Sequence, residues 1–205
     1  MNNEVNKSKF SVRKIAVTGI LSALSIALNF TPLAFMLVPG LPVQITFMHI
    51  PVIIGAIVEG PFAGAFIGMV FGLTSLYTAV QQSALPIAFA FLNPLVSILP
   101  RILIGIVAHY VYKGLNSIFK EKKQAVSIGI TAAAATLTNT IGVLGMIYIL
   151  YARRYVEALI SSLGLPADTT PVYIFVSALP NFIAELVSSI LICVPVVLAV
   201  KKIRK

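Results

Sequence analysis

Cysteine, histidine and tryptophan are scarce in this sequence, and each scarcity excludes a kind of site. There is one cysteine, Cys193, so no internal disulfide can form. The two histidines, His49 and His109, are too far apart in sequence for a metal-ligand motif, so we expect neither a metal nor another cofactor. The chain has no tryptophan, which slightly disfavours a site dominated by ring stacking.

Acidic residues are also few, with six in the whole chain. We find no Ser–His–acid set and no pair of carboxylates at one expected depth, so we do not expect an enzyme. The phosphate-binding pattern GxxxxGK[ST] is missing as well. The chain therefore cannot hydrolyse a nucleotide by itself.

Hydrophobic residues are what the sequence has in excess. They make up 59% of its 205 residues, charged residues make up 10%, and the mean hydropathy is +1.00. This composition is typical of a multi-pass protein of a cell membrane. The net charge of +9 does not indicate nucleic-acid binding, because the cations form short clusters between apolar segments. We therefore predict one transmembrane domain over residues 1–205.

The apolar segments predict an all-α fold of six transmembrane helices. They cover residues 12–29, 47–58, 62–80, 93–112, 125–150 and 172–200. Twelve of the fifteen lysines and arginines lie in the amino-terminal flank, the connection after the fourth span and the carboxyl-terminal tail. With six spans these places share one face, and the positive-inside rule makes that face cytoplasmic. Both termini are then cytoplasmic.

One arginine interrupts the fourth span. Arg101 has no charged neighbour in sequence and would lie about 12 Å along a helix that begins at Asn93. A cation at such a depth is costly unless it faces protein, water or an anion. Asn93, Ser97 and Arg101 follow one another at four-residue spacing, which places them on one polar stripe. The stripe predicts a protected cavity; the alternative is an ion pair with Glu185 that only joins two helices.

Polar residues on later spans have matching depths. Counted from the outer end, Asn181 lies at about 12 Å, like Arg101, while Asn139 and Glu185 lie at about 18 Å. We therefore predict a substrate pocket that opens to the outside. Its candidate residues are Asn93, Ser97, Arg101, Asn139, Asn181 and Glu185.

Small residues recur every four positions on the first span, at Gly19, Ala23 and Ala27. Such a ladder lets another helix approach closely. The partner is either a helix of this chain, which makes the ladder internal packing, or a helix of another protein.

Three stretches resemble the substrate-binding S component of energy-coupling factor (ECF) vitamin transporters. They are ITFMHIPVIIGAIVEGPFAGAFIGMVFGLTSL, NPLVSILPRILIG and TLTNTIGVLG, at residues 45–76, 93–105 and 136–145. The resemblance implies a prokaryotic six-helix protein that captures a vitamin from outside with high affinity. It also implies docking on a transmembrane coupling subunit that carries two cytoplasmic ATPases. Ala23 and Ala27 match the family's Ala-x-x-x-Ala docking motif, which Gly19 extends.

Within this family the sequence is most similar to the pantothenate type. Arg101 and the asparagines of the pocket suit a carboxylate and an amide. Glu185 instead favours an amine such as pyridoxamine, and riboflavin or cobalamin remain open. Two other classes also remain open: a stand-alone ion-coupled carrier with Glu185 as its relay, and a membrane scaffold without a ligand.

Overall fold

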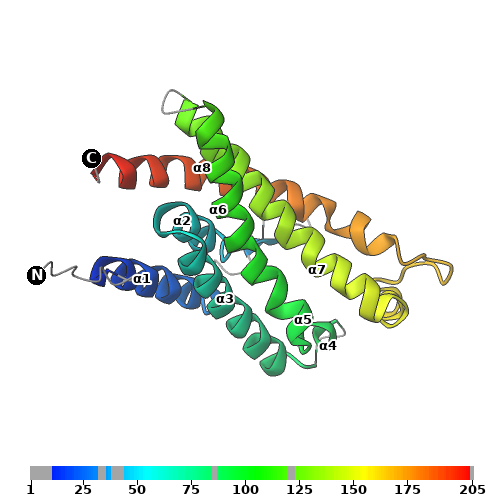
Figure 1. Ribbon diagram of the computed structural model, residues 1–205. Helices are drawn as coiled ribbons and strands as arrows, with labels where there is room; N and C mark the ends of the chain where they lie inside the picture. The colour runs from blue at the N-terminus through cyan, green and yellow to red at the C-terminus, as the bar shows by residue number, and fades with distance from the viewer. Residues whose placement is uncertain (1–10, 32–35, 38–43, 85–86, 120–122, 204–205) are drawn as a thin grey trace, which may run out of the picture.

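The computed structural model is a bundle of long helices with shorter elements between them (Figure 1). It describes residues 11–31, 36–37, 44–84, 87–119 and 123–203. The helices are α1 (Val12–Asn29), α2 (Ile50–Glu59), α3 (Pro61–Gln81), α4 (Ala88–Phe91), α5 (Pro94–Ser97), α6 (Leu99–Phe119), α7 (Gln124–Leu163) and α8 (Tyr173–Ile203). Two-residue strands, β1 (Met36–Leu37) and β2 (Gln44–Ile45), pair antiparallel between α1 and α2.

Among the described residues, five helical segments are long and apolar enough to cross a membrane. They are α1, α3, α5 with α6, α7 and α8. The remaining expected span, residues 47–58, corresponds to α2, which has 10 residues and is about 15 Å long. It is the central helix of the bundle, because it packs on α1, α3, α6 and α8 and its residues 50–57 are all buried. The prediction of an all-helical membrane bundle is confirmed.

Glycines let α3 approach its neighbours closely. A Cβ added at Gly64 would lie 2.5 Å from the Cβ of Ala56 on α2, and one at Gly68 would overlap the carbonyl oxygen of Arg101 on α6. Gly60 joins α2 to α3 with φ of 103°, a conformation that favours glycine. These contacts fix α6, and with it Arg101, against α3.

The fourth predicted span is interrupted near its outer end. Its first turn is α5, which Asn93 caps by accepting a hydrogen bond of 3.0 Å from the amide of Leu95. Ile98 separates α5 from α6. Pro100 in the first turn of α6 has no N–H group to continue the helical hydrogen bonds. Because of this interruption, Asn93 and Ser97 on the α5 side need not share a helix face with Arg101 on α6.

Helix α7 continues past Leu150, where we expected the fifth span to end. It bends at Tyr151, whose φ of −139° and ψ of 15° are not helical, and ends at Gly164 with φ of 65°. The added segment buries Tyr155, Val156 and Leu159 in a cluster with residues of α4 and the start of α8. The predicted connection 151–171 is thus largely helical, because those side chains form an apolar face.

Six of the nine described lysines and arginines gather at one end of the bundle, and Arg101, Arg153 and Arg154 are the exceptions. In Figure 1 the first turns of α1 and the last turns of α8 lie to the left, and the end of α6 meets the start of α7 at the top. That end carries Arg13, Lys14, Lys113, Lys123, Lys201 and Lys202. The opposite end carries α4, the end of α3 and the start of α8. Lys7, Lys9, Lys120, Lys122, Arg204 and Lys205 lie outside the described residues.

Candidate functional site

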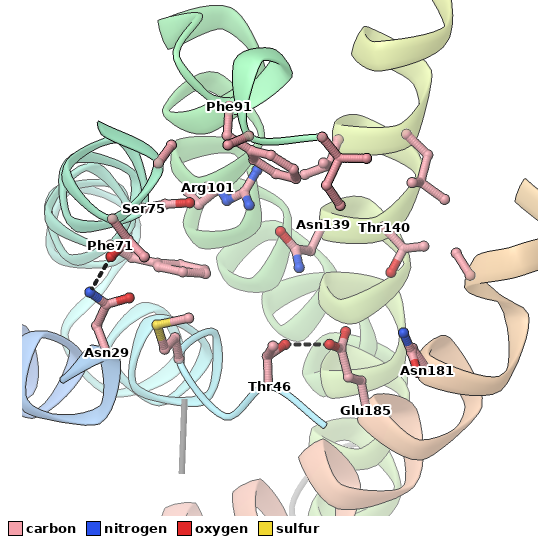
Figure 2. A pocket seen from close by; sticks show the side chains of 18 of the residues that line it. Asn29, Thr46, Phe71, Ser75, Phe91, Arg101, Asn139, Thr140, Asn181 and Glu185 are labelled. Carbon is pink, nitrogen blue, oxygen red and sulfur yellow. Dashed lines mark hydrogen bonds between the residues drawn. The ribbon is translucent and has the colours of Figure 1, made fainter. Parts of the chain in front are cut away.

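A cavity of about 490 Å³ lies in the half of the bundle away from the basic end. Helices α3, α7 and α8 form most of its wall, α6 contributes Arg101, and α1, α4 and the residues after β2 complete it. Apolar and polar residues line it in equal numbers. The polar lining residues are Asn29, Thr46, Ser75, Thr78, Gln82, Arg101, Asn139, Thr140, Asn181 and Glu185 (Figure 2).

Arg101 is held in the wall by the irregular start of α6. Its Nη1 donates a hydrogen bond of 2.7 Å to the carbonyl oxygen of Val96. In a regular helix that oxygen accepts from the residue four positions later, which here is Pro100 and has no N–H. The arginine side chain therefore takes the place of the missing donor. The same contact fixes the direction in which the guanidinium points.

The guanidinium lies between two aromatic rings. Its Cζ is 5.3 Å from the ring centre of Phe71 and 5.9 Å from that of Phe91, both of which line the cavity. Cation–π contacts of this kind stabilise the charge without using its N–H donors. Arg101 is 6% exposed, and its Nε has no hydrogen-bond partner among the described residues. Donor capacity thus remains for an anion in the cavity.

Glu185 lies across the cavity from Arg101 (Figure 2). It accepts a hydrogen bond from the hydroxyl of Thr46, which follows β2. In the described part of the chain no ion pair within 4.0 Å joins the two charges. The alternative in which Arg101 merely pairs with Glu185 is therefore not what the structure contains.

Two amides project toward the same space from α7 and α8. Asn139 is 8% exposed, and its Oδ1 has no hydrogen-bond partner among the residues described. Asn181 lies one helical turn before Glu185 on α8 and lines the cavity too. Thr140 adds a hydroxyl beside Asn139. This side of the cavity offers neutral donors and acceptors next to one carboxylate.

Asn93 and Ser97 do not line the cavity. Asn93 caps α5 and donates a 3.0 Å hydrogen bond to the hydroxyl of Tyr151, at the bend of α7. Ser97 is fully buried and donates to the carbonyl oxygens of Phe91 and Asn93. Both residues hold the outer connection beside the cavity. Of the six predicted site residues, the structure brings four together in its wall.

Six polar lining residues were not predicted from the sequence, and three of them lie on α1 and α3. Asn29 ends α1 and donates a 2.8 Å hydrogen bond to the hydroxyl of Thr78 on α3, while its Oδ1 has no described partner. Ser75 lies one turn before Thr78 on the same side of α3. The i, i+3 spacing of Ser75 and Thr78 in an apolar helix was the available signal. For Asn29 the signal was its place at the end of the first span.

The small-residue ladder lies on the outside of α1. Gly19, Ala23 and Ala27 are exposed, whereas the buried face of the helix carries Ser22 and Ser25 together with Asn29. A Cβ added at Gly19 would meet no atom within 4 Å. The ladder therefore lies on an exposed face of α1 and is not buried against another helix of the described structure.

The comparisons with known proteins agree with this architecture. Residues 13–197 match the family model for the substrate-specific component of ECF transporters. The pantothenic acid transporter PanT of Lactococcus lactis subsp. cremoris (strain MG1363) is 30% identical over an alignment of 215 positions, which covers 98% of this chain and 98% of the relative. The pantothenate transporter PanT of Leuconostoc mesenteroides subsp. mesenteroides is 31% identical over 143 residues, 67% of each chain.

A solved structure, ThiT from Listeria monocytogenes, has the same fold. It superposes with a TM-score of 0.61 over 93% of this chain and 96% of its own, at 16% identity. The family model spans most of the helical bundle, including every helix that lines the cavity. The resemblance drawn from the three sequence stretches is thus confirmed. This multi-pass membrane protein belongs to the substrate-specific components of ECF transporters.

Proposed function

We propose that this chain captures pantothenate from outside the cell and delivers it to an ECF-type importer. The observation that carries the proposal is the guanidinium of Arg101, which faces a cavity without an ion pair in the described structure. A buried cation of this kind is stabilised by an anionic ligand. The names of the two PanT relatives support pantothenate as that anion.

The distribution of polar groups suits the parts of pantothenate. Its carboxylate would accept hydrogen bonds from Arg101, and its amide would pair with Asn139 and Asn181. The hydroxyl groups at its other end would donate to Glu185, which already accepts from Thr46. Because Arg101 and Glu185 lie across the cavity from each other, the cavity also sets the orientation of the ligand.

The cavity suits binding without chemical change. Its volume of about 490 Å³ falls within the range of roughly 300–1,000 Å³ that small-molecule sites occupy. The described lining residues combine one carboxylate with amides and hydroxyls, and they do not offer an acid–base pair or a nucleophile with an adjacent base. The proposed role is therefore that of a vitamin-binding subunit and not of an enzyme.

Transport also needs an energy source and a contact surface. We assign the basic end to the cytoplasm by the positive-inside rule, which leaves the cavity in the outer half. The exposed ladder of Gly19, Ala23 and Ala27 is the proposed contact with a coupling subunit that carries two ATPases. Small residues permit the close helix approach that such a contact requires.

Equilibrium binding to the purified chain tests the proposal. Isothermal titration without ATP should show one site for pantothenate, with submicromolar affinity and little response to pyridoxamine, riboflavin or cobalamin. Stronger binding of one of these would assign a different vitamin. Uptake by vesicles that contain only this chain and an ion gradient would instead favour a stand-alone carrier.

A further inference from the structure

One polar corner of the cavity, where the end of α1 meets α3, takes no part in the proposed placement of pantothenate. Asn29 is the last residue of α1 and lines the cavity, although it is only 8% exposed. Its amide nitrogen donates a hydrogen bond of 2.8 Å to the hydroxyl of Thr78 on α3. Its Oδ1 is buried and has no hydrogen-bond partner among the described residues. The amide group therefore has a satisfied donor and an unsatisfied acceptor.

The bond to Thr78 also fixes the direction of this acceptor. The carbonyl and amino groups of an asparagine side chain are bonded to the same planar carbon, so a nitrogen held by α3 turns the oxygen away from that helix. Figure 2 shows the oxygen of Asn29 directed into the cavity. The adjacent residues Phe30 and Tyr77 join the same two helices, with their ring centres 6.0 Å apart. The acceptor thus lies on a well-held junction.

Joining α1 to α3 does not require the free oxygen, because the junction uses only the amino group of Asn29. Buried polar atoms in folded proteins nearly always have a hydrogen-bond partner, and a buried acceptor without a donor costs free energy. A ligand in the cavity can supply the missing donor. A carbonyl oxygen cannot bind a carboxylate, so the donor is a hydroxyl or N–H group.

The position of Asn29 along the cavity selects among the donors of pantothenate. Phe71 contacts the guanidinium of Arg101, and Thr78 contacts Asn29. Phe71 and Thr78 are seven residues apart on α3, which separates the two contacts by about 10 Å along the helix. Eight covalent bonds join the carboxyl carbon of pantothenate to its terminal hydroxyl oxygen, a length of about 10 Å in an extended chain. The amide N–H and the other hydroxyl lie nearer the carboxylate.

We infer that the Oδ1 of Asn29 accepts a hydrogen bond from the terminal hydroxyl of pantothenate, while Glu185 accepts one from the other hydroxyl. This inference rests on the proposed function, because it takes pantothenate as the ligand and Arg101 as the partner of its carboxylate. Figure 2 shows Asn29 and Glu185 on either side of Thr46. The hydroxylated end of the ligand is then held between α1 and α8. Asn29 thereby selects ligands with a donor at this distance from the carboxylate.

Calorimetric titration of the full chain with pantothenate and two analogues tests the inference. The wild-type chain should bind pantothenate about tenfold more tightly than an analogue in which hydrogen replaces the terminal hydroxyl. Asn29→Leu should bind pantothenate about tenfold more weakly than the wild type does and should no longer distinguish these two compounds. The second analogue lacks the other hydroxyl. Asn29→Leu should still discriminate against it by the wild-type factor, because Glu185 is unchanged.

Gln81→Leu is the matched control variant. Gln81 also lies on α3 and its amide donates a hydrogen bond of 3.0 Å to a hydroxyl, that of Tyr77, but it does not line the cavity. The control should keep the wild-type affinity and the wild-type preference for the terminal hydroxyl. Asn29→Ala should behave like Asn29→Leu, which keeps the test valid if leucine prevents folding. A monodisperse elution profile and a thermal unfolding curve check each variant.

The remaining outcomes separate this inference from the proposed function. A preference for the terminal hydroxyl that persists in Asn29→Leu and Asn29→Ala would overturn the inference, and Asn29 would then only join α1 to α3. Loss of that preference in Gln81→Leu would overturn it too, because the effect would not be specific to Asn29. Tight binding of pantothenate by a wild-type chain that ignores the terminal hydroxyl would overturn this inference alone. A wild-type chain that does not bind pantothenate would overturn the proposed function as well.

Discussion

The Nη1 atom of Arg101 lies 2.7 Å from the carbonyl oxygen of Val96, the acceptor that Pro100 leaves without a helical donor. A break in the backbone hydrogen bonds of α6 thus anchors the buried cation. Arg101 lines the cavity, and its Nε has no hydrogen-bond partner among the described residues. This arrangement makes the proline as important as the arginine for orienting a ligand.

Replacing Pro100 tests that relationship. Pro100→Ala restores an N–H at position 100, which then competes with Arg101 for the oxygen of Val96. We expect pantothenate affinity to fall about tenfold. The guanidinium loses the hydrogen bond that fixes its direction, and such a bond contributes about 1–1.5 kcal/mol. Titration calorimetry measures the change. Wild-type affinity in a stably folded variant would mean that Val96 does not orient the arginine.

Glu185 and Thr46 provide a second test. Glu185→Gln keeps an acceptor for the hydroxyl of Thr46 but removes the charge. We expect the affinity of this variant for pantothenate to fall only a few-fold, because the hydroxyls of the ligand still find an acceptor. The affinity of Glu185→Leu should fall roughly tenfold. A carboxylate required for an amine ligand would show the opposite pattern, with Glu185→Gln as damaging as Glu185→Leu. Competition binding with pyridoxamine distinguishes the two cases.

The exposed ladder of α1 predicts a separation between binding and transport. Ala23→Trp places a bulky side chain on the proposed docking face, so uptake by cells or by the reconstituted transporter should be abolished. Pantothenate binding to the isolated chain should remain unchanged, because Ala23 lies outside the cavity wall. Ile130→Trp on α7 is the control and should leave uptake intact. Uptake that survives Ala23→Trp would remove the ladder from the docking surface.

Close packing of α3 on α6 predicts a stability effect. A Cβ at Gly68 would overlap the carbonyl oxygen of Arg101, so Gly68→Ala should destabilise the bundle by about 1–3 kcal/mol. Gly145→Ala is the matched control, because a Cβ there meets no atom within 4 Å. Thermal unfolding in detergent compares the two. Equal melting temperatures would show that α3 and α6 can separate without cost.

Much of the bundle was predictable, because apolar runs and clustered cations follow directly from the bilayer. Arg101, Asn139, Asn181 and Glu185 were found by counting depth along predicted spans, and they line one cavity. Their part in binding stays a prediction. Asn93 was assigned to the same stripe on the assumption of one continuous helix.

The rest depended on local features that periodicity does not reveal. Pro100 and the short α5 turn Asn93 and Ser97 away from the cavity and into the outer connection. The helix beyond Leu150 was missed because its arginines and Glu157 gave it the polarity of a loop, although Val156 and Leu159 form an apolar face. The bend that joins both parts of α7 at Tyr151 depends on tertiary contacts with α4 and α5.

The proposed function depends most on Arg101, which we expect to bind the carboxylate of pantothenate. The most direct test compares pantothenate with pantothenol, which carries an alcohol in place of the carboxylate, on the wild-type chain and on Arg101→Ala. The wild-type chain should prefer pantothenate about 100-fold, as expected for a desolvated charge pair, and Arg101→Ala should bind both compounds with similar, weak affinity. A wild-type chain that binds the two equally, or an Arg101→Ala variant that keeps the full preference, would show that Arg101 does not bind the carboxylate.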